Sequence, residues 1–355
     1  MKPYVCVVGA VNLDICGRPE KKLIFRDSNP GAVTLTPGGV GRNIAHDLRL
    51  LGVEVKFLTA FGGDSHAQLL RNDCVELGMD LSCALDVPGG RTSTYLYITD
   101  ERGEMQLGLC DTDISAAITP AYLQRHLDVL NSAAAVVLDG NLTAETITWL
   151  GTHCSAPLFA DPVSVMKAER MRAALGALHT FKPNLTEGQN LTGESSPEGV
   201  VAALLAQGVQ RVFLSMGAEG ILAATRDETV HLPCLPTCMV NTTGGGDAVM
   251  AALGWAYLAL CSSCAEIPKA RPRRPLCAPE RPRSNIPAQT IPTSACSSTA
   301  EADQNGKNSR LPVPEACCFL ISISRCGKRL PRCTMPPRNI PPPLQTQRVC
   351  CRAPD

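Results

Sequence analysis

The stretch 243-TGGGDAVMAALGWAYLAL-260 joins a glycine loop to an apolar, helix-like segment. Gly244, Gly245 and Gly246 allow the backbone N–H groups to turn toward an anion, and a helix start behind them adds the positive end of its dipole. Asp247 cannot itself pair with that anion, so we interpret it as the group that orients and deprotonates an incoming hydroxyl, as phosphoryl transfer requires. Taken alone, the stretch is equally compatible with a simple turn that has an aspartate at a helix N-terminus.

Upstream of this loop, strand-like and helix-like segments alternate. Apolar, β-rich runs cover residues 4–8, 55–60, 135–138, 157–160, 180–182 and 212–215, and helix-like stretches cover 43–51, 67–77 and 166–177. This alternation predicts an α/β fold with a parallel sheet covered by helices on both faces. Residues 13–35 and 92–109 instead alternate polar and apolar side chains, which predicts a small antiparallel flap over a ligand at the carboxyl edge of the sheet.

A second glycine cluster, 37-PGGVGRNIA-45, precedes a predicted helix. Gly39 and Gly41 let a ligand approach the backbone, and Asn43 offers both a donor and an acceptor to sugar hydroxyls. Arg42 is either a contact to a base or phosphate or a solvated charge. The sequence has no GxxxxGK[ST] loop and no GxGxxG after its first strand, so the two commonest nucleotide-binding folds are disfavoured.

The two glycine clusters and their spacing resemble the signatures of the PfkB (ribokinase-like) carbohydrate kinases, over about residues 4–260. The resemblance implies a ribokinase-like three-layer sandwich with a mainly parallel central sheet and a small β lid, and it implies ATP and Mg²⁺ as cofactors. It assigns sugar binding to Asn12 and Asp14, although Asp14 alone also fits a turn. The residues it implies for nucleotide binding are Asn184, Ser215, Gly217 and Thr242, and Glu187 is implied as a metal ligand through water.

Four stretches look most like those of pseudouridine kinases within this family: 38-GGVGRNIA-45, 111-DTDI-114, 138-LDGN-141 and 160-ADPVS-164. The implied reaction is ATP-dependent phosphorylation of the 5′-hydroxyl of a nucleoside, pseudouridine. The alternatives are another PfkB sugar or nucleoside kinase, or an inactive nucleoside-binding fragment. The resemblance also implies a homodimer formed through the lid, and no nucleic-acid partner is expected.

Residues 261–355 have a different composition. They hold 16 of the 28 prolines and 10 of the 18 cysteines, and their 15 basic and 6 acidic residues contrast with 18 and 27 before them. We therefore predict a kinase domain over 1–260 that is truncated at its C-terminal end. The following tail is expected to be disordered or to derive from a change of reading frame near Ala259, and its one CxxC pair lacks the partner that a zinc site needs.

The N-terminal run 1-MKPYVCVVGAVNLDI-15 predicts a buried first strand, because Asn12 and Asp14 interrupt it and no small-residue cleavage site follows. No apolar stretch approaches the roughly 18 residues that a membrane span requires. The eight cysteines before residue 261 are mostly scattered, as in reduced proteins. We expect a cytoplasmic protein without a membrane partner.

Overall fold

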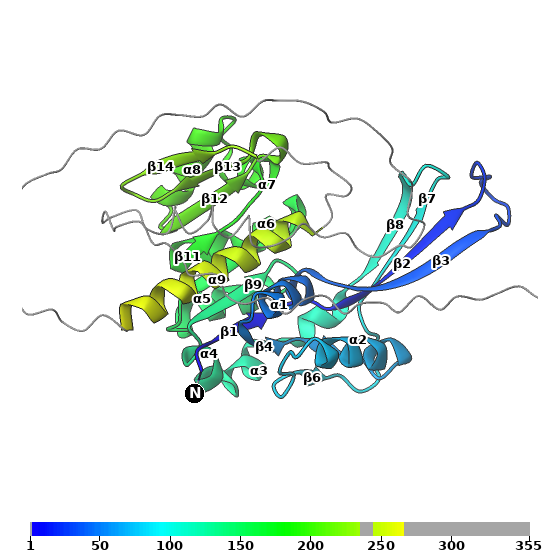
Figure 1. The fold of residues 1–355 in the computed structure, drawn as a ribbon, viewed down its shortest axis with the longest axis horizontal. Helices are drawn as coiled ribbons and strands as arrows, with labels where there is room; N and C mark the ends of the chain where they lie inside the picture. Colours follow the sequence, from blue (N-terminus) through cyan, green and yellow to red (C-terminus); the bar gives the residue numbers. More distant parts are fainter. Residues whose placement is uncertain (1, 235–243, 266–355) are drawn as a thin grey trace, which may run out of the picture.

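The computed structural model describes residues 2–234 and 244–265, and within them a mixed sheet of eight strands forms the centre (Figure 1). Its strand order is β14-β13-β12-β11-β10-β9-β1-β4. Neighbours from β4 to β12 pair in parallel, and β13 and β14 add an antiparallel edge. The strands are β1 (Tyr4–Val8), β4 (Glu54–Leu58), β9 (Ala135–Asp139), β10 (Leu158–Asp161), β11 (Leu178–Phe181), β12 (Arg211–Ser215), β13 (Ile221–Ala224) and β14 (Thr229–Leu232).

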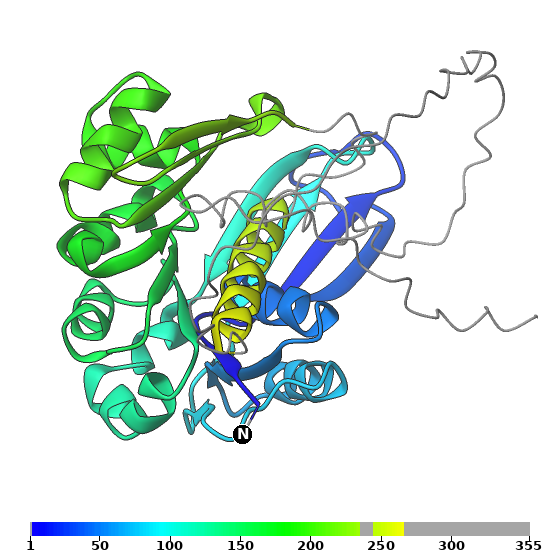
Figure 2. The same ribbon diagram turned by 60° about the vertical axis from the view of Figure 1, so that its left-hand side comes forward.

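Helices cover both faces of this sheet (Figure 2). One face carries α1 (Val40–Leu50), α2 (Ser65–Glu76) and α9 (Gly245–Ala265). The other carries α3 (Pro120–Gln124), α4 (Leu127–Asn131), α5 (Ala144–His153), α6 (Val165–Ala168), α7 (Leu185–Thr192) and α8 (Pro197–Ala206), with the 3₁₀ turns η1 (Asp113–Ala117) and η2 (Glu169–Ala177). A third turn, η3 (Gly217–Glu219), follows β12, and β5 (Ala60–Phe61) pairs with β6 (Leu85–Asp86).

The layers follow from the apolar pattern of the strands. Every residue of β1 is buried, and its side chains alternate between two hydrophobic cores because successive strand residues point to opposite faces. Cys6 and Val8 contact the core beneath α5 and α8, whereas Val5 and Val7 contact the core beneath α1 and α9. This arrangement confirms the predicted three-layer α/β sandwich with a mainly parallel sheet.

A smaller four-stranded sheet extends from one end of the body as a lid (Figure 1). It contains β2 (Asn12–Pro19), β3 (Gly31–Gly38), β7 (Thr94–Thr99) and β8 (Met105–Asp111). The flap predicted from sequence is present, but it is not purely antiparallel, because β2 and β7 pair in parallel between two antiparallel hairpins. The parallel pair is anchored where Asp64, the N-cap of α2, accepts hydrogen bonds from the backbone and hydroxyl of Thr92.

Two boundaries differ from the sequence-based prediction. The stretch 166–177 is a short α-helix that continues as the 3₁₀ turn η2, not one α-helix. Helix α9 continues to Ala265, past the proposed boundary at residue 261. The predicted tail otherwise lies outside the described residues, and so does Thr242. Among the described helices, none is both long and apolar enough to cross a bilayer.

Candidate active site

The candidate site lies where the parallel strands end, the usual position for ligands in open α/β sheets. Asp139 is the last residue of β9, Asp161 is the last residue of β10, and Lys182 directly follows β11. Helix α9 begins at Gly245 and brings Asp247, 8% exposed, into the same region. Four charged residues that are far apart in sequence therefore meet at one edge of the sheet, all of them buried.

A direct hydrogen bond joins the two glycine motifs. Asn43 Nδ2, in the first turns of α1, donates to Asp247 Oδ2 at 2.9 Å. The amide of Asn43 is held in turn by Arg42, whose Nη1 lies 3.3 Å from Asn43 Oδ1, and Arg42 is anchored by an ion pair with Asp73 at 2.6 Å. Arg42 is therefore neither a solvated charge nor free to reach a ligand, because it is buried and its guanidinium is used inside the protein.

The pKa of the Asp247 carboxyl group is shifted upward, toward neutral pH. Burial is the largest of the effects that raise the pKa of Asp247 to about 7, and the nearby charges of Asp161 and Asp47 act in the same direction, against the effects of Asn43 and Lys182. A general base works best when its pKa lies near the working pH. Asp247 is thus a buried carboxyl group whose pKa lies in the range that suits a general base.

Lys182 is a site residue that the sequence analysis did not single out. Its Nζ lies 3.0 Å from Asp161 Oδ2, and both side chains are almost fully buried. Burial alone lowers the pKa of Lys182, but the charges of Asp161, Glu187 and Asp247 outweigh burial and raise it. The ammonium group is therefore fixed and charged.

The ammonium of Lys182 lies directly beside the glycine loop. A Cβ built on Gly246 would stand 3.2 Å from Nζ, whereas the space around Gly244 and Gly245 is open. Gly244 has φ +79°, a conformation that glycine adopts without strain. Gly244 to Gly246, the start of α9 and one buried cation lie together next to Asp247, and this combination is suited to an anion. The only sequence signal for Lys182 is its position at the end of a strand.

The sugar-side candidates lie at the base of the lid. Asn12 Nδ2 donates to Asp14 Oδ1 at 2.5 Å, and burial raises the pKa of Asp14 to about 6 against the effects of Asn12 and Arg42. Gly39 has φ +97°, and a Cβ there would lie 2.5 Å from the carbonyl oxygen of Ala10. Gly39 therefore brings the start of α1 close to the backbone that joins β1 to β2.

Gly41 serves a different contact. A Cβ on Gly41 would stand 2.9 Å from the Cα of Gly9, so its lack of a side chain lets α1 pack against the end of β1. Gly41 is buried in this contact. The structure therefore relates Gly41 to packing of the α1 N-terminus and relates Gly39 to the turn that precedes it.

The nucleotide-side candidates lie at the ends of β11 and β12. Asn184 and Ser215 form an isolated parallel bridge, and Gly217, exposed with φ +60°, begins the turn η3. Asn184 and Glu187 close a reciprocal capping box at the start of α7, with bonds of 2.9 and 2.8 Å. Burial raises the pKa of Glu187. Within residues 2–234 and 244–265, no group of three or more His, Cys, Asp or Glu side chains is arranged to hold a metal ion.

The order of the strands separates these three clusters. Asp14 is on β2, which follows the end of β1 after a short connection, the Asp161–Lys182 pair lies at β10 and β11, and Ser215 ends β12. Because neighbouring strands are about 4.8 Å apart, the four steps from β1 to β12 span roughly 19 Å. The Asp161–Lys182 pair therefore lies between the Asp14 end and the Ser215 end of this row, an arrangement that is suited to transfer between two bound molecules.

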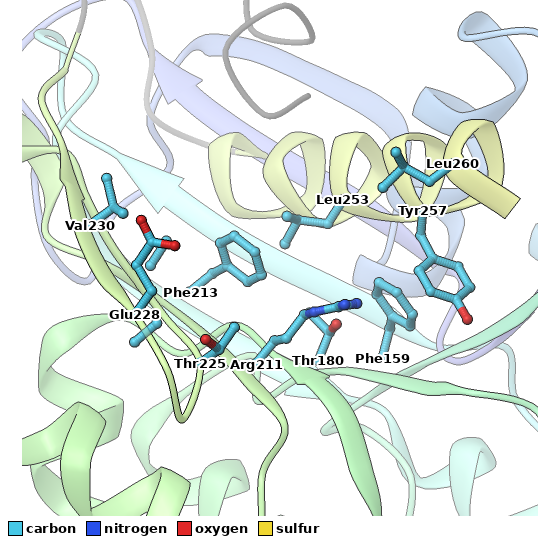
Figure 3. A pocket seen from close by; sticks show the side chains of 12 residues that line it. Phe159, Thr180, Arg211, Phe213, Thr225, Glu228, Val230, Leu253, Tyr257 and Leu260 are labelled. Atoms are coloured by element: carbon cyan, nitrogen blue, oxygen red, sulfur yellow. The ribbon is translucent and has the colours of Figure 1, made fainter. Parts of the chain in front are cut away.

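A separate apolar pocket lies beside the middle of α9 (Figure 3). Leu253, Tyr257 and Leu260 line it from the helix, and Phe159, Phe213 and Arg211 line it from the sheet. Asp247 is not among its lining residues. The pocket marks sheet surface beside α9 that the described residues do not cover completely.

Comparison with known proteins defines the class. A sequence model of the pfkB family carbohydrate kinases matches residues 2–263. The chain belongs to this family, and it is a phosphotransferase with an alcohol group as acceptor. The "Pseudouridine kinase" of Escherichia coli (strain K12) is 40% identical over 259 residues, which cover 71% of this chain and 83% of that protein.

Solved structures confirm the ribokinase-like fold. A carbohydrate kinase from Agrobacterium tumefaciens superposes with a TM-score of 0.63 at 26% identity, covering 74% of this chain and 91% of that one. An Arabidopsis thaliana ribokinase, solved in complex with ribose and ATP, has a TM-score of 0.64 at 21% identity, covering 73% of this chain and 87% of that one. These likenesses agree with the mainly parallel sheet and the β lid described above.

Proposed function

We propose that the protein transfers the γ-phosphoryl group of ATP to the 5′-hydroxyl of a nucleoside, and that this nucleoside is pseudouridine. The observation that carries the proposal is the 2.9 Å hydrogen bond between Asn43 and Asp247, because it links the sugar-side motif to the proposed general base next to the anion site. The 40% identity to a pseudouridine kinase supports the choice of nucleoside.

In this proposal Asp14 accepts hydrogen bonds from two ribose hydroxyls, and Asn12 holds its carboxylate in place. A carboxylate with two free lone pairs suits a vicinal diol, and such charge-assisted bonds are stronger than neutral ones. Asp247 accepts the proton of the 5′-hydroxyl as its oxygen attacks the γ-phosphorus. The bond from that phosphorus to the β,γ-bridging oxygen breaks, and ADP leaves.

The phosphoryl group meets a preorganised positive site. The amides of Gly244 to Gly246, the start of α9 and the ammonium of Lys182 stabilise its charge without rearranging. Asn184, Ser215, Gly217 and Thr242 bind ATP in this proposal. Mg²⁺, when bound, would neutralise phosphate charge, and in this proposal Glu187, one of whose carboxylate oxygens caps α7, holds it through water.

Asp14→Asn tests the sugar-side role. The expected result is a ten- to a hundredfold rise in the KM for pseudouridine, about what loss of hydrogen bonds to a charged group removes, with a smaller change in kcat. Steady-state kinetics in a coupled ADP assay measure it. A variant whose KM equals that of the wild type would contradict the assignment of Asp14. The variant Asp80→Asn, which removes a surface partner of Lys56, serves as the control.

A second candidate function is nucleoside binding without efficient transfer. The partly uncovered pocket beside α9 favours this alternative. Helix α9 carries Asp247 and follows the glycine loop, and incomplete packing of the helix makes the position of both less rigid. The two functions separate in one assay, because this alternative predicts nucleoside binding with no ADP release.

We further propose that the protein is cytoplasmic and forms a dimer through its lid. The outward face of the lid exposes a set of large apolar side chains, at 51–68% exposure: Val33, Leu35, Leu107 and Leu109. Exposed apolar patches on soluble proteins commonly mark interfaces.

The double variant Leu107→Glu/Leu109→Glu is expected to convert the dimer into a monomer, because four buried carboxylates would face each other across a two-fold interface. Light scattering after size exclusion measures the mass. Val75→Glu, at an exposed site on α2, is the control and leaves the mass unchanged. A wild-type chain that is monomeric at micromolar concentration contradicts the proposal.

A further inference from the structure

Two of the five tyrosines of the chain lie next to each other on the lid. The rings of Tyr95 and Tyr97, both on β7, have centroids 5.5 Å apart and planes inclined by 27°. Both are only partly buried. Aromatic side chains are otherwise scarce in this protein, at 4% of residues, so a partly exposed pair on a small sheet needs an explanation.

Strand register puts this pair on the same face of the lid as Asp14. In the parallel pairing of β2 with β7, Tyr95 is opposite Asp14 and Tyr97 is opposite Cys16. Paired residues in neighbouring strands point to the same side of a sheet. Burial, the Cys16 thiol and the charge of Asp14 raise the pKa of Tyr97 to about 12, which agrees with this placement and keeps the phenol neutral.

The two faces of the lid differ in kind. The face opposite to Asp14 carries the aliphatic pair Leu96 and Leu109, joined across β7 and β8. The Asp14 face carries the tyrosines and, on β3, Thr34 and Thr36. An aromatic surface bordered by small hydroxyl side chains is suited to a flat ring with polar edges.

A glycine makes room for one of the rings. A Cβ on Gly108, in the neighbouring strand β8, would stand 2.9 Å from the hydroxyl oxygen of Tyr95. Tyr95 therefore lies across Gly108, and its hydroxyl reaches Met105 Sδ at 3.2 Å. The hydroxyl end of Tyr95 is thus held against β8, while the side chain as a whole stays only partly buried.

We propose that Tyr95 and Tyr97 form the platform on which the pyrimidine base of the nucleoside stacks, and that they determine the preference for nucleosides over simple sugars. This inference rests on the proposed function, because it assumes that Asp14 binds the ribose. Strands advance about 3.3 Å per residue, so Tyr97 lies roughly 7 Å farther along the lid than Tyr95. A base attached to a ribose at Asp14 reaches this distance.

The test compares binding of pseudouridine and of D-ribose by calorimetry, without ATP, to the full chain and its variants. Tyr95→Leu and Tyr97→Leu are expected to weaken pseudouridine binding by about ten- to a hundredfold, as loss of base–aromatic stacking does, and to leave ribose binding within about twofold. Tyr95→Phe and Tyr97→Phe keep the rings and are expected to retain the affinity for pseudouridine within about threefold.

The outcomes separate this inference from the proposed function. If the wild type binds pseudouridine no better than ribose, nucleoside specificity is wrong and the platform is wrong with it. If the wild type prefers pseudouridine and both leucine variants keep that preference, only the platform is overturned. Equal loss of pseudouridine and ribose binding in the leucine variants also overturns it, because it would show that the rings only support the lid.

Discussion

Asp247→Asn is expected to lower kcat by about a thousandfold while pseudouridine binding stays within about threefold of the wild type. Asparagine keeps the shape of the side chain but cannot accept the proton of the hydroxyl, and general bases contribute on the order of 10²- to 10⁴-fold. Single-turnover kinetics and calorimetry measure the two quantities. Asp80→Asn, at a partly exposed carboxylate that pairs with Lys56, is the control for removal of one carboxylate.

The stability of this variant is also predictable. Asp247 has its pKa raised from 3.8 to about 7 in the folded state, so between these values the folded state keeps a proton that the unfolded state releases. The free energy of unfolding of the wild type therefore falls as pH rises through this window. Asp247→Asn removes this pH-dependent decrease, so urea unfolding at pH 8 is expected to show a free energy of unfolding equal to or greater than that of the wild type. A variant that is both inactive and strongly destabilised would contradict a catalytic role for Asp247.

Lys182→Met is expected to reduce both stability and activity. Removing one partner of a buried ion pair leaves Asp161 charged and unpaired, which costs about 3–5 kcal/mol. Without the ammonium, the pKa of Asp247 rises further, because Lys182 now lowers it. The wild-type rate should fall as pH drops through about 7, where Asp247 becomes protonated, and this acid limb should move to higher pH in the variant.

A second variant separates the structural role of Lys182 from its electrostatic one. Lys182→Met/Asp161→Asn removes both charges, so we expect it to recover much of the lost stability. It should not recover kcat, because the anion site still lacks its cation. Urea unfolding and the pH dependence of kcat measure the two effects. If activity returns together with stability, Lys182 acts only in packing.

The fold was accessible from sequence because its signals are local. The glycine loop before Asp247, the cluster before Asn43 and the buried strands such as β1 each contain their own pattern. The resemblance to the PfkB kinases then joined these segments, and the family match over residues 2–263 confirms it. The parallel pairing of β2 with β7 was missed because alternation predicts strands but not their partners.

The buried charges could not be predicted for a similar reason. The sequence left Arg42 as either a ligand contact or a solvated charge and did not single out Lys182, because only tertiary structure brings Asp73 to Arg42 and Asp161 to Lys182. Burying a charge is unfavourable, and in both cases this is offset by an ion-pair partner that is distant in sequence. The relation of Tyr95 and Tyr97 to Asp14 could not be predicted either, since it depends on the register of two strands that are distant in sequence.

The most direct test of the account is the reaction of the purified 355-residue chain with ATP, Mg²⁺ and pseudouridine. ADP release is measured together with ³¹P NMR of the nucleoside product. We predict ADP release that depends on pseudouridine, a product with phosphate on its 5′-oxygen, and loss of both signals in Asp247→Asn. Binding of pseudouridine without any ADP release, or a rate that Asp247→Asn leaves unchanged, would contradict the account.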